Sequence, residues 1–118
     1  MASVPAKRGN KFKAKRTACR HGHVHDSKKE AGRCNDLHIL QRAGAISGLE
    51  QQPVYRFTIN GVPVTHLNGR QLKFTPDFRY IEGGRLTVED AKGVRTEAYQ
   101  VRAAFFRACH PELILRET

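Results

Sequence analysis

The sequence contains no long hydrophobic run and few cysteines. No apolar stretch approaches the ~18–20 residues needed to span a bilayer, and the N-terminus lacks the hydrophobic segment of a signal peptide. The cysteines are odd in number and give no disulfide framework: Cys19, Cys34 and Cys109. These absences argue against a membrane-spanning or disulfide-stapled protein, and we expect a cytoplasmic location.

Acidic residues are missing from the first 20 positions, whereas the whole chain has a formal net charge of +10. This segment contains Pro5 and Gly9 and shows no apolar periodicity. We therefore predict a flexible basic arm over residues 1–20, in front of one domain over residues 21–118. The arm is expected to contact nucleic-acid phosphates through its cations, Lys7, Arg8, Lys11, Lys13, Lys15, Arg16 and Arg20. A tail that only keeps the protein soluble is the alternative.

Length and composition indicate a single folded domain. The chain has 118 residues, of which 39% are hydrophobic and 27% are charged. That is enough to bury a modest core, and the composition is not that of a disordered protein. The chain has no internal repeats, so a repeat architecture is not expected.

A first helix is predicted to begin at Ser27 and to end before Gly44. Ser27 and Glu30 have the spacing of a capping box, in which each side chain accepts a hydrogen bond from the other residue's amide. Glu30 also starts a stripe that faces inward, followed by Cys34, Leu37 and Gln41. Glu30 is therefore either a partner of the helix dipole or a site residue.

Alternating apolar residues predict strands after this helix. Residues 54–59 and 62–64 would pair around the hairpin signal Asn60-Gly61, with Pro63 favouring an edge or a bulge. Residues 74–80 and 86–92 would form a second hairpin around Gly83-Gly84.

A second helix is predicted over residues 96–109, before a short last strand over residues 113–115. Thr96 can cap this helix and Pro111 ends it. Its apolar side would be formed by Ala98, Val101, Phe105 and Ala108. The order α-β-β-β-α-β predicts an α/β fold with a mixed central sheet of about four strands, flanked by helices.

The second hairpin fixes a register. If Gly83-Gly84 is a two-residue turn, Glu82 faces Arg85, and this pair has complementary charge. Counting back along both strands then places Asp77 opposite Asp90. Their Cβ atoms would be about 4.5–5.5 Å apart.

Side chains alternate along a strand, so Asp77, Asp90 and Lys92 would share one face, with Glu89 on the other. Two opposed carboxylates need a counter-charge or a shared proton. Mg²⁺, or Mn²⁺ in its place, is the obvious partner, because a hard cation binds one or two carboxylates together with phosphate oxygens. A surface hairpin with a salt bridge between Lys92 and one aspartate is the structural alternative.

These residues resemble a known signature. Pro76-Asp77, followed after twelve residues by Asp90-Ala91-Lys92, resembles the motif of PD-(D/E)XK nucleases, which have a restriction-endonuclease-like fold. That superfamily also places an acid on its first helix, where this chain has Glu30. Longer stretches also resemble a family of small phage and prophage proteins, catalogued chiefly as a domain of unknown function: residues 26–31, 49–53 and 88–93.

The resemblance implies a metal-dependent endonuclease that hydrolyses DNA phosphodiester bonds. Asp77 and Asp90 would bind Mg²⁺ or Mn²⁺, assisted by the backbone carbonyl of Ala91. Lys92 would orient or activate the attacking water and offset charge in the transition state. Glu30 would hold a second metal or a metal-bound water.

Gln52, near the start of the first strand, is a weaker candidate for a DNA contact at the rim of the site. A nuclease this small, with no separate specificity domain, is expected to recognise DNA shape. Holliday-junction resolvases and nickases act in this way in phage or prophage DNA processing, inside the bacterial host cell. Cutting paired strands favours a homodimer.

Two rival functions use the same residues differently. The first is a non-catalytic DNA-binding accessory protein on the same fold. The second is a zinc-stabilised interaction module, because thiolate and imidazole ligands gather at Cys19, His21, His23, His25 and Cys34. The one-residue gaps between these histidines differ from the usual spacing of zinc ligands, so zinc is not the expected metal.

Overall fold

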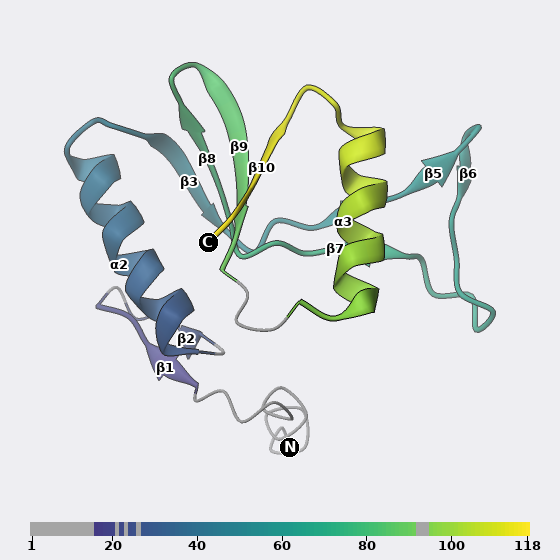
Figure 1. The fold of residues 1–118 in the computed structure, drawn as a ribbon, viewed down its shortest axis with the longest axis horizontal. Coiled ribbons are helices and arrows are strands. Elements are labelled where there is room, and N and C mark those ends of the chain that lie inside the picture. Colours follow the sequence, from purple (N-terminus) through teal and green to yellow (C-terminus); the bar gives the residue numbers. More distant parts are fainter. Residues whose placement is uncertain (1–15, 21, 23, 26, 92–94) are drawn as a thin grey trace.

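The computed structural model describes residues 16–20, 22, 24, 25, 27–91 and 95–118 (Figure 1). A four-stranded mixed sheet lies at the centre of this part, between helix α2 (Lys28–Arg42) and helix α3 (Glu97–Cys109). The mixed α/β class predicted from the sequence is confirmed. In the described part of the chain, neither helix is long and apolar enough to cross a membrane.

The central sheet has the strand order β10-β9-β8-β3. Strand β8 (Phe78–Glu82) pairs antiparallel with both β3 (Ser47–Gln51) and β9 (Arg85–Asp90), whereas β10 (Ile114–Glu117) pairs with β9 in parallel. Parallel neighbours need a crossover connection, and α3 supplies it. The two helices and four strands follow the order α-β-β-β-α-β along the chain, but β3 takes the first strand position, and the predicted strands over residues 54–59 and 62–64 lie outside the central sheet.

Helix α2 begins and ends where the sequence indicates. The Ser27 hydroxyl accepts a hydrogen bond of 3.2 Å from the backbone N–H of Glu30, and Gly44 follows the helix with a φ of 84°. The predicted inward stripe is confirmed. Its apolar members pack on one face of the sheet, in a cluster of Cys19, Ala31, Cys34, Leu37, Ile46, Phe78 and Tyr80.

Helix α3 begins at the predicted cap but buries a different side. The Thr96 hydroxyl accepts a hydrogen bond of 3.2 Å from the Tyr99 N–H. The predicted apolar side is wrong, because its members Val101 and Phe105 are 48% and 37% exposed. The core on this face of the sheet instead contains Tyr99, Ala103 and Phe106 of the helix, together with Phe57, Phe74 and Val88. Phe105 and Phe106 are adjacent, so the sequence is compatible with burial of either the side that contains Phe105 or the side that contains Phe106.

Residues 52–77 leave the sheet between β3 and β8 and form a segment that we call the ribbon insert. Strand β4 (Tyr55–Arg56) pairs with β7 (Lys73–Phe74), and β5 (Thr58–Ile59) pairs with β6 (Val62–Pro63). The predicted Asn60-Gly61 turn is confirmed. In Figure 1 the β5–β6 hairpin lies beyond α3, at the edge of the molecule away from α2.

One predicted strand covers two observed strands, and one observed strand was not predicted. The sequence predicts one strand over residues 74–80, but β7 ends at Phe74 and β8 begins at Phe78. Pro76 lies between them and has no backbone N–H to donate to a ladder. Strand β3 was not predicted, because its sequence has no apolar alternation and contains Gly48 (φ 64°).

The hairpin of β8 and β9 has the predicted register. Glu82 pairs with Arg85, and the ladder continues to the pair Phe78 and Glu89. The two glycines of the turn, Gly83-Gly84, have φ values of 59° and 76°. A two-residue turn of this kind requires positive φ at both positions, which glycine adopts without steric cost.

A small antiparallel pair, β1 (Thr17–Ala18) and β2 (Val24–His25), contacts α2. Cys19 is buried, and the Arg20 N–H donates a hydrogen bond of 2.8 Å to Asn35 Oδ1 of α2. The described fold therefore includes residues 17–20, which the sequence assigned to the basic arm. Residues 1–15 of that arm lie outside the described residues.

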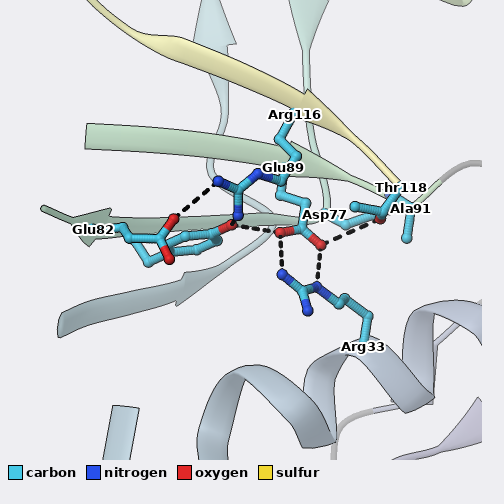
Figure 2. Close-up of polar contacts among 8 residues, drawn as sticks. Arg33, Asp77, Glu82, Glu89, Ala91, Arg116 and Thr118 are labelled. Atoms are coloured by element: carbon cyan, nitrogen blue, oxygen red, sulfur yellow. Dashed lines mark hydrogen bonds and ion pairs between the residues drawn. The ribbon is translucent and has the colours of Figure 1, made fainter. Parts of the chain in front are cut away.

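A buried polar network joins α2 to β8, β9 and β10 (Figure 2). Glu89 is fully buried, and its carboxylate accepts two hydrogen bonds from the Arg33 guanidinium, one of them 3.0 Å long. The Tyr80 hydroxyl donates to Glu89 at 2.5 Å and accepts a bond of 2.9 Å from Arg116. The Thr118 hydroxyl donates to the other oxygen of Glu89 at 3.3 Å.

Contact with Glu89 raises the pKa values of two of its partners. The hydrogen bond with Glu89 raises the pKa of Arg33 above its usual value. Burial, followed by the hydrogen bond with Glu89, raises the pKa of Tyr80 to about 12. A buried carboxylate is costly unless it is paired and hydrogen-bonded, and the surroundings of Glu89 meet both conditions.

Removing the charge of Glu89 should therefore destabilise the fold strongly. We expect Glu89→Gln to lower the free energy of unfolding by about 3 kcal/mol, because it leaves the Arg33 guanidinium without its counter-charge. Urea unfolding measures this loss. The control is Glu50→Gln, which breaks the more exposed ion pair with Arg79 and should cost less than ~1 kcal/mol. Equal losses in the two variants would contradict the prediction.

Candidate functional site

The predicted site residues lie at one end of the central sheet. The Gln52 N–H donates a hydrogen bond of 2.9 Å to the Asp77 carbonyl, where β3 and β8 meet. The β8–β9 register, continued by one residue, places Asp77 opposite Asp90, and Asp90 pairs with Glu117 of β10. We call these four residues the polar row. Each of the four residues lies at or next to the end of a different strand of the sheet.

The carboxylate of Asp77 is held by the strand opposite. Asp77 is 6% exposed, and its Oδ2 accepts a hydrogen bond of 2.8 Å from the backbone N–H of Ala91 (Figure 2). This bond uses one carboxylate oxygen and thereby fixes the direction of the other. It also joins the two halves of the predicted motif, since Ala91 lies between Asp90 and Lys92 in the sequence.

Asp90 is fully buried and lies on the face of the sheet that α3 covers. Strand alternation turns it away from Glu89, which faces α2. Burial is the main cause of the raised pKa of Tyr99 on α3, and the negative charge of Asp90 adds to it. The Tyr99 hydroxyl donates a hydrogen bond of 2.8 Å to Glu117. Arg95 lies 3.4 Å from the same carboxylate, so Arg95 and α3 form one wall of the site.

Glu30 lies toward the same end of the sheet, but on the opposite face. The Cys34 Sγ lies 3.8 Å from Gln51 Oε1, and two turns later Gln41 Oε1 accepts a bond of 2.8 Å from the Leu49 N–H. Helix α2 therefore runs antiparallel to β3, and its first turn, which contains Glu30, points toward the polar row. Glu30 is 5% exposed.

The oxygen donors of the site fit a hard divalent cation. Asp77, Asp90 and the carbonyl of Ala91 are the kind of ligands that Mg²⁺ uses, with water or phosphate oxygens completing its coordination. Within the described ranges, no three His, Cys, Asp or Glu side chains gather in a group that could hold a metal ion. Glu30 thus does not join the two aspartates in one three-carboxylate cluster.

Several predicted residues cannot be placed in this site. Lys92 lies outside the described residues, as do the predicted DNA-binding residues Lys7, Arg8, Lys11, Lys13 and Lys15. Arg16 and Arg20 are described and exposed, but they belong to the β1–β2 region rather than to the polar row.

Gln52 is exposed beside Asp77 and has a φ of 48°. A non-glycine residue rarely adopts this left-handed conformation, and the strain costs roughly 1–3 kcal/mol. The hydrogen bond from Gln52 to Asp77 holds the backbone in place at this point. Strained residues of this type concentrate at functional sites, which supports the predicted position of Gln52 at the rim.

Sequence reasoning missed Tyr99 and Glu117. The wrong phase of the second helix hid Tyr99, and the parallel pairing that sets the register of Glu117 has no turn signal to reveal it. A usable signal for Tyr99 was the Thr96 cap, because a cap places the third residue after it in the first helical turn. That turn follows the strand that carries Asp90.

The fold and the site together define a mixed α/β domain with two aspartates at one end of its sheet. Residues 9–117 match the model of the family described as "Protein of unknown function (DUF1064)", and the chain belongs to this family. The predicted membership of a family of unknown function is confirmed. Searches of curated proteins and of solved structures gave no match.

The cysteines near α2 are poor nucleophiles in this fold. Cys19 and Cys34 are buried, whereas Cys109 is exposed. Burial, with a further contribution from the contact with Cys19, raises the pKa of Cys34 to about 12. Only the thiolate reacts, so Cys34 is inert at neutral pH. Of the alternative zinc ligands, His21 and His23 lie outside the described residues.

Thiol labelling should separate these cysteines. At pH 8 we expect one rapid reaction per chain with a thiol reagent, at Cys109, and slow reaction of the other two until the protein unfolds. In the unfolded chain the Cys34 thiol ionises above about pH 8.5, whereas in the fold its raised pKa keeps it neutral. The free energy of unfolding should therefore fall as the pH rises above ~8.5. Cys109→Ser should remove the rapid phase. A rapid phase that persists in this variant would show that Cys19 or Cys34 is accessible.

Proposed function

We propose that this protein is a metal-dependent endonuclease that hydrolyses DNA phosphodiester bonds. The observation that carries the proposal is the hydrogen bond between Asp77 and the Ala91 amide. It holds a buried carboxylate opposite a second one, Asp90, within the motif that resembles the PD-(D/E)XK signature. We also assign the fold to the restriction-endonuclease-like class, supported by the element order and the mixed sheet.

In the proposed reaction, a water molecule gives up a proton to solvent and attacks the phosphorus. The P–O bond to the leaving sugar oxygen breaks, and that oxygen takes up a proton from solvent. Asp77, Asp90 and the carbonyl of Ala91 would hold Mg²⁺ or Mn²⁺, which supplies charge stabilisation and lowers the pKa of water. Lys92, two residues after Asp90, would orient the attacking water and offset the charge of the transition state. Glu30 would accept a hydrogen bond from water on the α2 side.

The substrate and the assembly follow from the same proposal. The net charge of +10 and the acid-free first 20 residues support a polyanionic partner. We propose that the substrate is DNA recognised by shape, as by a Holliday-junction resolvase or a nickase in phage or prophage DNA processing. A homodimer acting in the cytoplasm would cut paired strands symmetrically.

A DNA-binding accessory protein without cleavage activity is the second candidate. The favouring observation is that cations are abundant outside the polar row, including a basic groove at the ribbon insert. This candidate shares the DNA binding and differs only in the chemistry of the aspartates.

Neutralising either aspartate should abolish cleavage. In Asp77→Asn the amide oxygen can still accept the Ala91 hydrogen bond, so the variant should fold while its metal affinity is lost. We expect no detectable cleavage by Asp77→Asn or Asp90→Asn, with unchanged DNA affinity in chelator. The assay combines the protein with Mg²⁺ or Mn²⁺ and single-stranded, duplex, flap and four-way-junction DNA.

The matched control is Asp36→Asn, which changes an exposed aspartate on α2 that is not part of the polar row. This variant should cleave like the wild type. Wild-type cleavage by both active-site variants, or full activity in excess chelator, would rule out the assignment. Binding of DNA without cleavage of any substrate would favour the accessory protein.

Glu30 offers a test of its role beyond capping. Glu30→Gln preserves the hydrogen bond to Ser27, because the backbone amide is the donor. We expect the cleavage rate to fall by roughly 10–100-fold, as for other groups that support metal ligands. The control is Glu97→Gln, which removes the acid from the first turn of α3. A cleavage rate for Glu30→Gln equal to that of Glu97→Gln would leave Glu30 a structural role only.

A further inference from the structure

A groove lies between the ribbon insert and α3, away from α2. Its volume is about 530 Å³. The turn after Thr65 and the strand β7 supply most of its lining, and α3 supplies the remainder. The seven described residues that line it are His66, Leu67, Asn68, Arg70, Gln71, Lys73 and Arg102, and none of them is acidic.

The turn that supplies most of these residues is internally hydrogen-bonded. The His66 N–H donates to the Arg70 carbonyl at 2.8 Å, and the Gly69 N–H donates to the His66 carbonyl at 2.9 Å. The Asn68 side chain accepts a bond of 2.9 Å from the Arg70 N–H. A bridge between Thr65 and Gln71 closes the base of the turn. The backbone that carries Arg70 is therefore fixed before any ligand binds.

Aromatic packing fixes the other side of the groove. Phe74 lies next to Lys73 on β7, and its ring is 5.1 Å from that of Phe106 and 6.0 Å from that of Tyr99 on α3. Arg102 lies on the same helix between these two anchors and is half-buried. Cations about 30 residues apart in the sequence are thus held around one groove.

The positive charge of the groove is not neutralised within the described residues. The ion pairs of the described part of the chain involve cations outside the groove, among them Arg33, Arg79, Arg95 and Arg116. The sequence adds to this excess, because residues 51–76 contain no aspartate or glutamate. Three cations that have no acidic partner in the described part of the chain attract an anionic ligand.

Both walls of the groove are close along the chain to residues of the polar row or to their partners. Lys73 precedes Asp77 by four residues, which span at most about 13 Å in extended chain. On α3, Arg102 lies one helical turn after Tyr99, whose hydroxyl bonds to Glu117. A ligand that reaches from the groove to the polar row must be extended, and the cations of the groove favour a ligand with negative charge. Leu67 is exposed at the tip of the turn and offers an apolar contact beside the cations.

We propose that this groove binds the sugar–phosphate backbone of the nucleic acid whose cleavage is assigned to the polar row. The inference rests on the proposed function. At about 3.4 Å per nucleotide along one strand, the groove would contact phosphates within about four nucleotides of the bond that is cut. Arg70, Lys73 and Arg102 supply the charge, independently of the basic N-terminal segment.

The test is a triple variant, Arg70→Gln/Lys73→Gln/Arg102→Gln, in the full-length chain. Its counterpart, Lys28→Gln/Arg42→Gln/Arg107→Gln, removes the same charge from exposed positions outside the groove. Fluorescence anisotropy with labelled duplex DNA, in chelator and over a range of salt, measures affinity without cleavage. The slope of log affinity against log salt should become shallower in the groove variant, by up to about 0.9 for each phosphate that the variant no longer neutralises.

The affinity of the groove variant should also fall by roughly tenfold or more, and by clearly more than that of its counterpart. Arg70 and Lys73 are exposed, so the single variants Arg70→Gln and Lys73→Gln should fold even if the triple variant does not. Each should show a smaller shift of the same sign. Equal effects in the groove variants and the counterpart would overturn the groove assignment.

Cleavage in Mg²⁺ separates this inference from the proposed function. Cleavage by the wild type, with unchanged DNA affinity in the groove variant, would refute the groove and leave the nuclease proposal standing. Groove-dependent binding without any cleavage would refute the nuclease proposal and support the groove as a nucleic-acid site. A groove-dependent loss of affinity for isolated phosphate ions as well as for DNA would identify a site for small anions, which would overturn the backbone assignment.

Discussion

The fold depends on the placement of one buried carboxylate. Glu89 lies on β9, an inner strand of the sheet, beneath α2, and Arg33, Tyr80 and Thr118 satisfy its oxygens. These partners come from the helix, from the neighbouring strand and from the residue after β10. A carboxylate at this depth is tolerated only when all of these segments are in position. The network therefore selects one arrangement of helix and strands, and a shift of β9 by one residue would turn Glu89 into the opposite core and Asp90 under α2.

The alternation of side chains along β9 places Glu89 and Asp90 on opposite faces of the sheet. Along β9, Glu89 faces the helix that holds it, whereas Asp90 faces α3 and the polar row. Adjacent acids with nearly identical intrinsic properties thus occupy different surroundings on opposite faces. The Asp77–Ala91 hydrogen bond then links the two strand ends across the hairpin. The packing of both faces therefore fixes the positions of Asp77 and Asp90, to which we assign metal binding.

Local signals in the sequence predicted much of this structure. The caps at Ser27 and Thr96, the Asn60-Gly61 turn and the Gly83-Gly84 register are set by neighbouring residues, and all four are confirmed. The failures concern interactions between distant segments. Strand β3 has no apolar alternation of its own and is defined by its partner β8. The buried side of α3 depends on aromatic residues of the ribbon insert, such as Phe74, which no local pattern connects to the helix.

The site was predicted in part. The hairpin register placed Asp77 opposite Asp90. The position of Glu117 depends instead on the parallel pairing of β10 with β9, a strand more than 20 residues earlier, and no local signal in the sequence indicates that pairing.

The ribbon insert begins and ends at neighbouring points, because Gln52 and Asp77 are hydrogen-bonded to each other. Its base is anchored by Phe57 and Phe74 in the core, whereas Ile59 and Val62 near its tip are 53% and 63% exposed. Doubling the length of a loop adds only about 0.6 kcal/mol of closure entropy. The tip is therefore a place where members of the family could gain, lose or exchange sequence at little thermodynamic cost. Such changes would alter what the outer surface touches, while the two ends of the insert kept the spacing of the aspartates unchanged.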